Sequence, residues 1–152
     1  MGATLRNGHI GLNVTDLDRS REFYSRVLGY ELVRQSPEGT PQARRYAFLG
    51  RDGVPLLTLW QQAEAGYGAE RSGLHHLSFE VDSVDEVRAA ESVLRELGTV
   101  FQYDGVVPHR EGADSGGVFF EDPDGIRLEI YSATGAAEAE APSGGEPTCG
   151  FF

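Results

Sequence analysis

Hydrophobic and polar residues alternate in two short stretches of the chain, and a helical pattern follows each stretch. The first copy, GHIGLNVTDLDRSREFYSRVLG, begins at Gly8, and the second, HHLSFEVDSVDEVRAAESVLRELG, begins at His75. In each, the alternation typical of a half-buried strand gives way to Asp or Ser, which favour a helix N-cap, and then to an amphipathic helix. A glycine stop closes each helix, at Gly29 and Gly98. The pattern therefore predicts a strand and a helix, twice.

The two stretches are copies of one repeat. With one constant offset, His9 matches His76 and Asp18 matches Asp85. Further strands are predicted after each helix, at 30–35, 44–49 and 54–61 in the first half and at 100–103, 117–120 and 126–131 in the second. We therefore predict an α+β protein made of two βαβββ modules, at about residues 5–62 and 73–132.

These modules are expected to form one domain over residues 1–132. A four-stranded sheet with a single helix leaves a bare face, so the modules should pair as a half-barrel around a cavity. Residues 133–152, rich in Ala, Gly, Glu and Pro, break the pattern and predict a flexible tail. The terminal Phe151 and Phe152 are unusual for disorder, and packing of the tail on a partner subunit is one interpretation.

Composition narrows the possible partners. The formal net charge of −11 argues against nucleic acid, which needs a basic face, and leaves a small-molecule substrate as the expected partner. No apolar run is long enough to cross a membrane, and MGATLRNGH lacks the apolar core of a signal peptide. The single cysteine, Cys149, fits a reducing compartment, so a cytoplasmic location is expected. With no cation near it in sequence, Cys149 is interpreted as an inert, exposed thiol.

Three residues are candidates for metal binding. His9 and His76 occupy the same place in the two copies, and His76 is in phase with the repeat, so His75 should point to the other face. In IRLEIYS, Glu129 alternates with isoleucine and leucine, and a carboxylate on a buried face needs a partner. Two imidazoles and one carboxylate would make a divalent-metal site with open positions, whereas each histidine alone is more often structural.

The segments GHIGLNVTDLDRSREFYSRVLGYELV, LHHLSFEV and FFEDPDGIRLEIYS resemble those of the vicinal oxygen chelate superfamily. That superfamily includes glyoxalase I, methylmalonyl-CoA epimerase, fosfomycin-resistance transferases, extradiol dioxygenases and bleomycin-binding proteins. The resemblance covers about residues 5–132. It implies paired βαβββ modules, metal ligands at His9, His76 and Glu129, and a cavity completed within one chain or by module exchange in a homodimer.

Departures from the family pattern bear on the subgroup. Glyoxalase I has a fourth ligand, a glutamate, where this chain has Thr58, a poor ligand, while Gln61 and Gln62 are out of register. Three ligands are similar to extradiol dioxygenases, in which a histidine lies near the place of His109. The tyrosine that those enzymes carry before the DPDG turn is matched here by Phe119, which weakens the likeness.

The sequence therefore leaves three functions open. The first is a dioxygenase-like enzyme that acts on vicinal oxygens such as those of a catechol, with His109 as acid–base residue. The second is a glyoxalase-like lyase, isomerase or thiol transferase, and the third a metal-free, bleomycin-type drug-binding resistance protein. Fe(II) is favoured as the cofactor, although Mn(II), Ni(II), Co(II) and Zn(II) suit the same ligands. The expected substrate-pocket residues are Tyr46, Thr58, Trp60 and Phe119.

Overall fold

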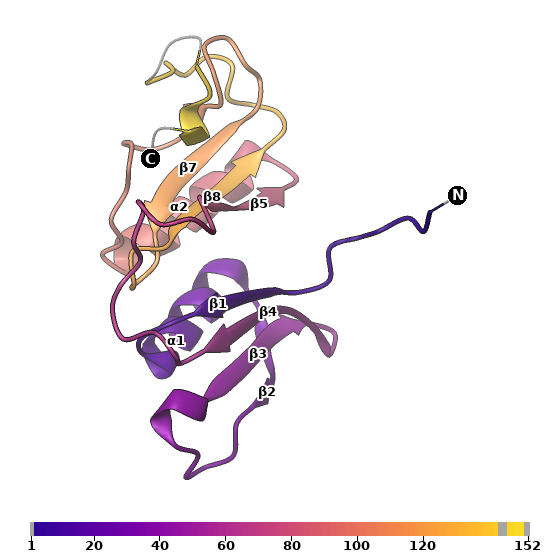
Figure 1. The fold of residues 1–152 in the computed structure, drawn as a ribbon. Coiled ribbons are helices and arrows are strands. Elements are labelled where there is room, and N and C mark those ends of the chain that lie inside the picture. The colour runs from indigo at the N-terminus through magenta and orange to yellow at the C-terminus, as the bar shows by residue number, and fades with distance from the viewer. Residues whose placement is uncertain (1, 143–145, 151–152) are drawn as a thin grey trace. The chain divides into compact units, whose positions relative to one another are not determined.

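The chain folds into two compact units, which meet in sequence at Gly66 and Tyr67. A computed structural model describes residues 2–142 and 146–150. Each unit contains one four-stranded sheet and one long helix, so the two βαβββ modules predicted from the sequence are confirmed. Figure 1 shows each helix lying across one face of its own sheet.

The first unit runs β1 (Ile10–Asn13), α1 (Leu17–Leu28), β2 (Glu31–Gln35), β3 (Tyr46–Arg51) and β4 (Val54–Trp60), with a short 3-10 turn, η1, at Gln42–Arg44. The sheet order is β1-β4-β3-β2, and β1 is parallel to β4 while the other pairs are antiparallel. The crossover through α1 thus brings the first and last strands side by side.

The second unit repeats this plan with β5 (Leu77–Val81), α2 (Val84–Glu96), β6 (Val107–Pro108), β7 (Gly116–Glu121) and β8 (Arg127–Ser132). The sheet order is β5-β8-β7-β6, again with a parallel first pair. A second 3-10 turn, η2 (Thr148–Gly150), follows near the end of the chain. Since β5 and β8 are neighbours, residues at their ends lie close together.

Local chemistry explains where the helices begin. The Asp16 side chain accepts a hydrogen bond from Arg19 N at 3.1 Å and caps α1. Ser83 and Glu86 form a capping box at the start of α2. Gln61 Oε1 accepts a hydrogen bond from the backbone N–H of Leu17 at 2.7 Å. Gln61, which is out of register with the ligand position, therefore binds the first turn of α1.

One predicted strand is shorter than expected. Residues 100–103 form only an isolated bridge, between Phe101 and Phe120, and the fourth strand of this sheet is β6 instead. Gly105 follows with φ of 74°, a left-handed conformation that interrupts extended backbone two residues before β6 begins. Pro108 then limits β6, because proline has no N–H to donate to a ladder.

The segment after β8 is partly packed on the second unit. Ala136 and Thr148 are fully buried, although the sequence indicated a flexible tail. The terminal Phe151 and Phe152, for which packing was considered, lie outside the described residues. No helix within the described part of the chain is both long and apolar enough to cross a membrane.

Candidate metal centre

Glu129 is a carboxylate on a strand whose neighbours are hydrophobic. In β8, Leu128 and Ile130 are fully buried and point to the face that α2 covers. Because side chains alternate along a strand, Glu129 points to the opposite face, beside Ser78 and Phe119 of the adjacent strands. Its exposed fraction is only 2%. A buried charge without partners is very costly, so this carboxylate must be paired.

Two imidazoles lie against the Glu129 carboxylate. His76 Nε2 is 3.6 Å from Oε2, and His109 Nε2 is hydrogen bonded to Oε1. The remaining ring nitrogens are also held, since His109 Nδ1 lies 2.8 Å from Ser115 Oγ and His76 Nδ1 lies 2.8 Å from His75 Nδ1. A partner on the far nitrogen fixes the orientation of an imidazole, as it does for histidines that bind metals.

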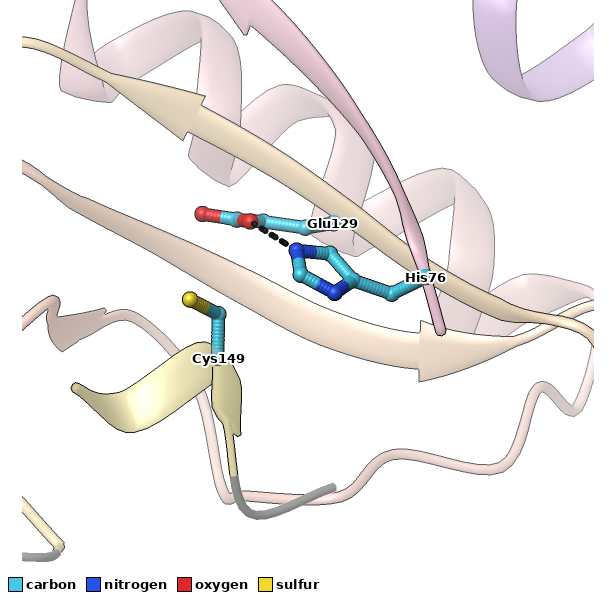
Figure 2. A group of neighbouring side chains, drawn as sticks. All are labelled: His76, Glu129 and Cys149. Atoms are coloured by element: carbon cyan, nitrogen blue, oxygen red, sulfur yellow. Dashed lines mark ion pairs between the residues drawn. The ribbon is translucent and has the colours of Figure 1, made fainter. Parts of the chain in front are cut away.

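Cys149 joins this group from the C-terminal segment. Figure 2 shows the thiol of η2 beside the His76 and Glu129 side chains. One potential ligand atom from each of the three residues lies within 4.8 Å of the other two. The thiol is half-buried, where the sequence indicated an exposed cysteine. The sequence carried no local signal for this contact, because the three residues are far apart along the chain.

Burial changes the proton affinities of this cluster. It lowers the pKa of His76, and the nearby Glu129 charge partly opposes that shift. Burial also raises the pKa of the Cys149 thiol, and the Glu129 charge adds to the increase. The first shift favours neutral imidazole, the form that binds a metal. A cation placed here would reverse the second, because it stabilises the thiolate.

The other predicted ligand, His9, belongs to the first unit. It precedes β1 just as His76 precedes β5, so the repeat places both at the head of an equivalent strand. His9 is exposed in the single chain. The position of His9 in the repeat, rather than a contact, is what makes it a candidate.

Strand register also identifies the counterpart of Glu129 in the first unit. Gly11 of β1 pairs with Thr58 of β4, as Ser78 of β5 pairs with Glu129 of β8. Thr58 is therefore the repeat equivalent of Glu129. It is 1% exposed, and its hydroxyl accepts a hydrogen bond from Trp60 Nε1 at 3.0 Å. The first unit thus offers a hydroxyl where the second offers a carboxylate.

The predicted pocket residues of the first unit share one sheet face. The rings of Tyr46, Phe48 and Trp60 lie 5.2–5.8 Å apart, centroid to centroid, over the face away from α1. Thr58 pairs with Phe48 on that face. Tyr46 and Trp60 are half-buried, so parts of both rings are accessible to a ligand.

Phe119, the fourth predicted pocket residue, lies beside the carboxylate in the second unit. It is fully buried. Its ring packs edge-on against Tyr103, with the centroids 5.6 Å apart, and against His109, with the centroids 6.3 Å apart. The Tyr131 ring lies 5.0 Å from that of His109. These aromatic contacts hold the imidazole next to Glu129.

The donor set fits a divalent metal ion. Imidazole, carboxylate and thiolate are the protein groups that bind Zn(II) and its neighbours in the first transition series. Bonds of about 2.0–2.3 Å would place adjacent ligand atoms about 3–4 Å apart, so small side-chain rotations bring these atoms to bonding distance. A cation would also neutralise the buried charge of Glu129. His76 and Glu129 therefore form a credible centre for an ion.

Comparison with known proteins identifies related chains. The model of the Glyoxalase/Bleomycin resistance protein/Dioxygenase superfamily matches residues 6–130. A glyoxylase/bleomycin resistance protein/dioxygenase domain from Frankia sp. has a similar structure, with a TM-score of 0.69 and 26% identity over 86% of this chain and 93% of that one. FosX, a fosfomycin resistance protein from Listeria monocytogenes solved with Mn(II) and sulfate, has a TM-score of 0.61 and 21% identity, over 88% and 95% of the two chains. At that identity, the FosX likeness shows the fold alone.

Sequence relatives have several activities. A trivalent organoarsenical cleaving enzyme of Bacillus sp. is 32% identical over 95% of this chain and 83% of its own length. A probable lactoylglutathione lyase of Vibrio cholerae is 30% identical over 80% of this chain and 86% of its own. A catechol-2,3-dioxygenase of Bacillus subtilis is 30% identical over 82% of this chain, which spans only 40% of that larger enzyme.

Proposed function

Because the chain belongs to the glyoxalase, bleomycin resistance protein and dioxygenase superfamily, we propose that it is a divalent-metal-dependent enzyme with dioxygenase-type activity. Its substrate is a small molecule with vicinal oxygens, such as a catechol. The observation that carries the proposal is the buried Glu129 carboxylate between two imidazoles, His76 and His109. FosX, a protein of this fold, was solved with Mn(II), and a catechol-2,3-dioxygenase is among the relatives.

The proposed ligands are His76, Glu129 and, from the first unit, His9. We favour Fe(II), because Thr58 offers no carboxylate and the remaining coordination positions stay open, although Mn(II), Ni(II), Co(II) and Zn(II) suit the same donors. A bound ion would supply Lewis acidity toward two substrate oxygens and, as Fe(II), redox chemistry with dioxygen. The support for His9 is its place in the repeat.

His109 is the proposed acid–base residue. Its Nε2 is hydrogen bonded to Glu129 Oε1, and its Nδ1 is held by Ser115. A cation that took up the charge of Glu129 would weaken the bond to Nε2. With the ring hydrogen on Nδ1, where it is donated to Ser115 Oγ, Nε2 would be able to accept a proton from a substrate hydroxyl. Ser115 and the ring of Phe119 keep the imidazole in place.

Tyr46, Thr58 and Trp60 are proposed to line the substrate side of the first unit. The two rings present apolar faces on which a planar substrate can stack. The Thr58 hydroxyl accepts a hydrogen bond from Trp60 and retains its own hydrogen to donate. For Phe119, its complete burial supports a role in holding His109.

A second candidate function is a lyase or isomerase that uses the ion only as a Lewis acid. Its support is the similarity to lactoylglutathione lyases, which are 30–34% identical to this chain over at least 80% of its length. Thr58 is the observation against it, because the resemblance to glyoxalase I implies a glutamate there. The two candidates differ in whether dioxygen is consumed.

Oxygen uptake by the Fe(II)-loaded protein with a panel of catechols tests the proposal. We expect uptake that falls at least about 100-fold in Glu129→Ala, as for a residue that stabilises the transition state. Uptake should persist in Glu80→Ala, which removes an exposed carboxylate. Turnover of a hemithioacetal without oxygen would favour the lyase. Tight binding of bleomycin that survives chelation and Glu129→Ala would replace both by a sequestering function.

We also propose that the protein is a homodimer. Dimers are common in this family, and His9 is exposed in a single chain. Analytical ultracentrifugation should give twice the 16.5 kDa mass of one chain. A monomer mass at micromolar concentration, with and without metal, would contradict the dimer.

A further inference from the structure

The C-terminal segment is anchored next to the candidate metal centre. Thr148 is fully buried, its Oγ1 donates a hydrogen bond to the carbonyl of Pro108 at 2.7 Å, and its backbone N–H donates to the carbonyl of His109 at 2.8 Å. The Tyr103 hydroxyl donates to the carbonyl of Thr148 at 3.1 Å. Three bonds from the core of the second unit thus fix the residue that precedes Cys149.

This anchor points the thiol at the carboxylate. Figure 2 shows Cys149 on the same side of the sheet as His76 and Glu129. Their potential ligand atoms converge within 4.8 Å, and the three residues come from η2, the segment before β5, and β8. Cys149 lies outside both the repeat and the DPDG turn, so neither motif predicts its position. The thiol is therefore an additional donor, and the hydrogen bonds of Thr148 determine its position.

We propose that Cys149 is a ligand of the metal ion held by His76 and Glu129, so that the tail delivers a thiolate to the centre. This inference rests on the proposed metal site. When a divalent ion enters, the thiol loses its proton to solvent and one metal–sulfur bond forms, with no change of oxidation state.

The thiolate also sets which ions bind well. Sulfur is a soft donor that favours Co(II), Zn(II) and Cd(II), whereas imidazole and carboxylate alone also suit Mn(II). Removing the sulfur should therefore weaken Cd(II) binding far more than Mn(II) binding. A half-buried cysteine with a purely packing role would affect both ions equally.

Titration of the metal-free protein with Co(II), under a non-thiol reductant, tests the proposal by absorbance. We expect a near-ultraviolet thiolate-to-cobalt band in the wild type. Cys149→Ser should lose this band while it still binds Co(II). Thr148→Val, which removes the side-chain anchor but keeps the sulfur, should bind Co(II) with a weaker band. Cd(II) affinity should fall about 10-fold or more in Cys149→Ser, because loss of a residue that only hydrogen bonds to a metal ligand already costs about that much. Mn(II) affinity should change little.

The outcomes separate this inference from the proposed function. If Glu129→Ala abolishes Co(II) binding but the wild-type complex shows no sulfur band, the metal site stands and Cys149 is not a ligand. If Glu129→Ala binds Co(II) as tightly as the wild type, the metal site and the thiolate ligand both fail. Equal losses of Cd(II) and Mn(II) affinity in Cys149→Ser would overturn the assignment in favour of a packing role.

Discussion

At the scale of single residues, the decisive feature is a carboxylate that the fold buries and the imidazoles that compensate it. Glu129 is nearly inaccessible to water, and His76 and His109 contact its two oxygens. A hydrogen bond to a charged group contributes about 1.5–3 kcal/mol to stability, and leaving the charge unpaired costs at least as much. The stability of the cluster therefore depends on these imidazole partners, and a bound cation should take over part of their compensation of the charge.

His109→Ala tests this relationship. In the presence of a chelator, the substitution should lower the free energy of unfolding by about 1.5–3 kcal/mol, because Glu129 loses the partner of Oε1. With saturating Mn(II), the loss should be smaller, since the ion compensates the carboxylate and only the lost packing remains. Urea unfolding under both conditions measures the difference.

The control for this experiment is His75→Ala, since His75 is exposed and touches His76 rather than Glu129. It should change stability by less than about 0.5 kcal/mol in the absence of metal. A loss in His109→Ala that is the same with chelator and with Mn(II) would show that the ion does not act on Glu129.

At the scale of secondary structure, the sequence predicted most elements because short-range chemistry sets them. Alternation predicted β1, β5 and β8, and the caps at Asp16 and Ser83 fixed the starts of both helices. The strand expected at residues 100–103 does not form. The edge strand is β6 instead, where Val107 pairs with Gly117 after the left-handed turn at Gly105. Edge pairing depends on tertiary contacts that periodicity does not contain.

The close approach of β7 and β8 gives a prediction at this scale. A Cβ added to Gly117 would lie 2.1 Å from the carbonyl oxygen of Ile130, so the backbone of the strand that carries Glu129 would have to move. Gly117→Ala should destabilise the protein by about 1–3 kcal/mol, the usual cost of overpacking.

Urea unfolding measures this cost, with Gly8→Ala as the control because an added Cβ there meets nothing within 4 Å. The control should stay within about 0.5 kcal/mol of the wild type. Equal stability of Gly117→Ala and Gly8→Ala would mean that the two strands are not packed as closely as described.

At the scale of the whole molecule, the repeat and the tail contribute differently to the candidate site. The repeat pointed to His9 and His76, and the alternation in IRLEIYS pointed to Glu129. Strand register then identified Thr58 as the equivalent of Glu129. Cys149 was not predictable, because its position depends on hydrogen bonds between Thr148 and residues about 40 positions earlier. Local sequence patterns carry no information about such a contact.

Docking of the tail can be measured directly. Thr148→Val keeps the shape of the side chain but removes the hydrogen bond to the carbonyl of Pro108, which should cost about 1 kcal/mol. Because that bond holds the neighbouring thiol against the core, Cys149 should react faster with a thiol reagent. Thr134→Val, at an exposed position, is the control. Unchanged labelling in Thr148→Val would contradict the anchoring role.

The most direct test of the central claim, that this chain holds a divalent ion at Glu129, is equilibrium dialysis of purified protein against Mn(II) with metal analysis. The wild type and Glu80→Ala should each bind one ion per chain with similar affinity. Glu129→Ala should bind Mn(II) more than about 100-fold more weakly. That is a larger loss than the roughly 10–100-fold typical when a residue that only hydrogen bonds to a metal ligand is removed. His9→Ala should also bind more weakly, because His9 is a proposed ligand. Equal metal content in the wild type and a folded Glu129→Ala protein would contradict the account.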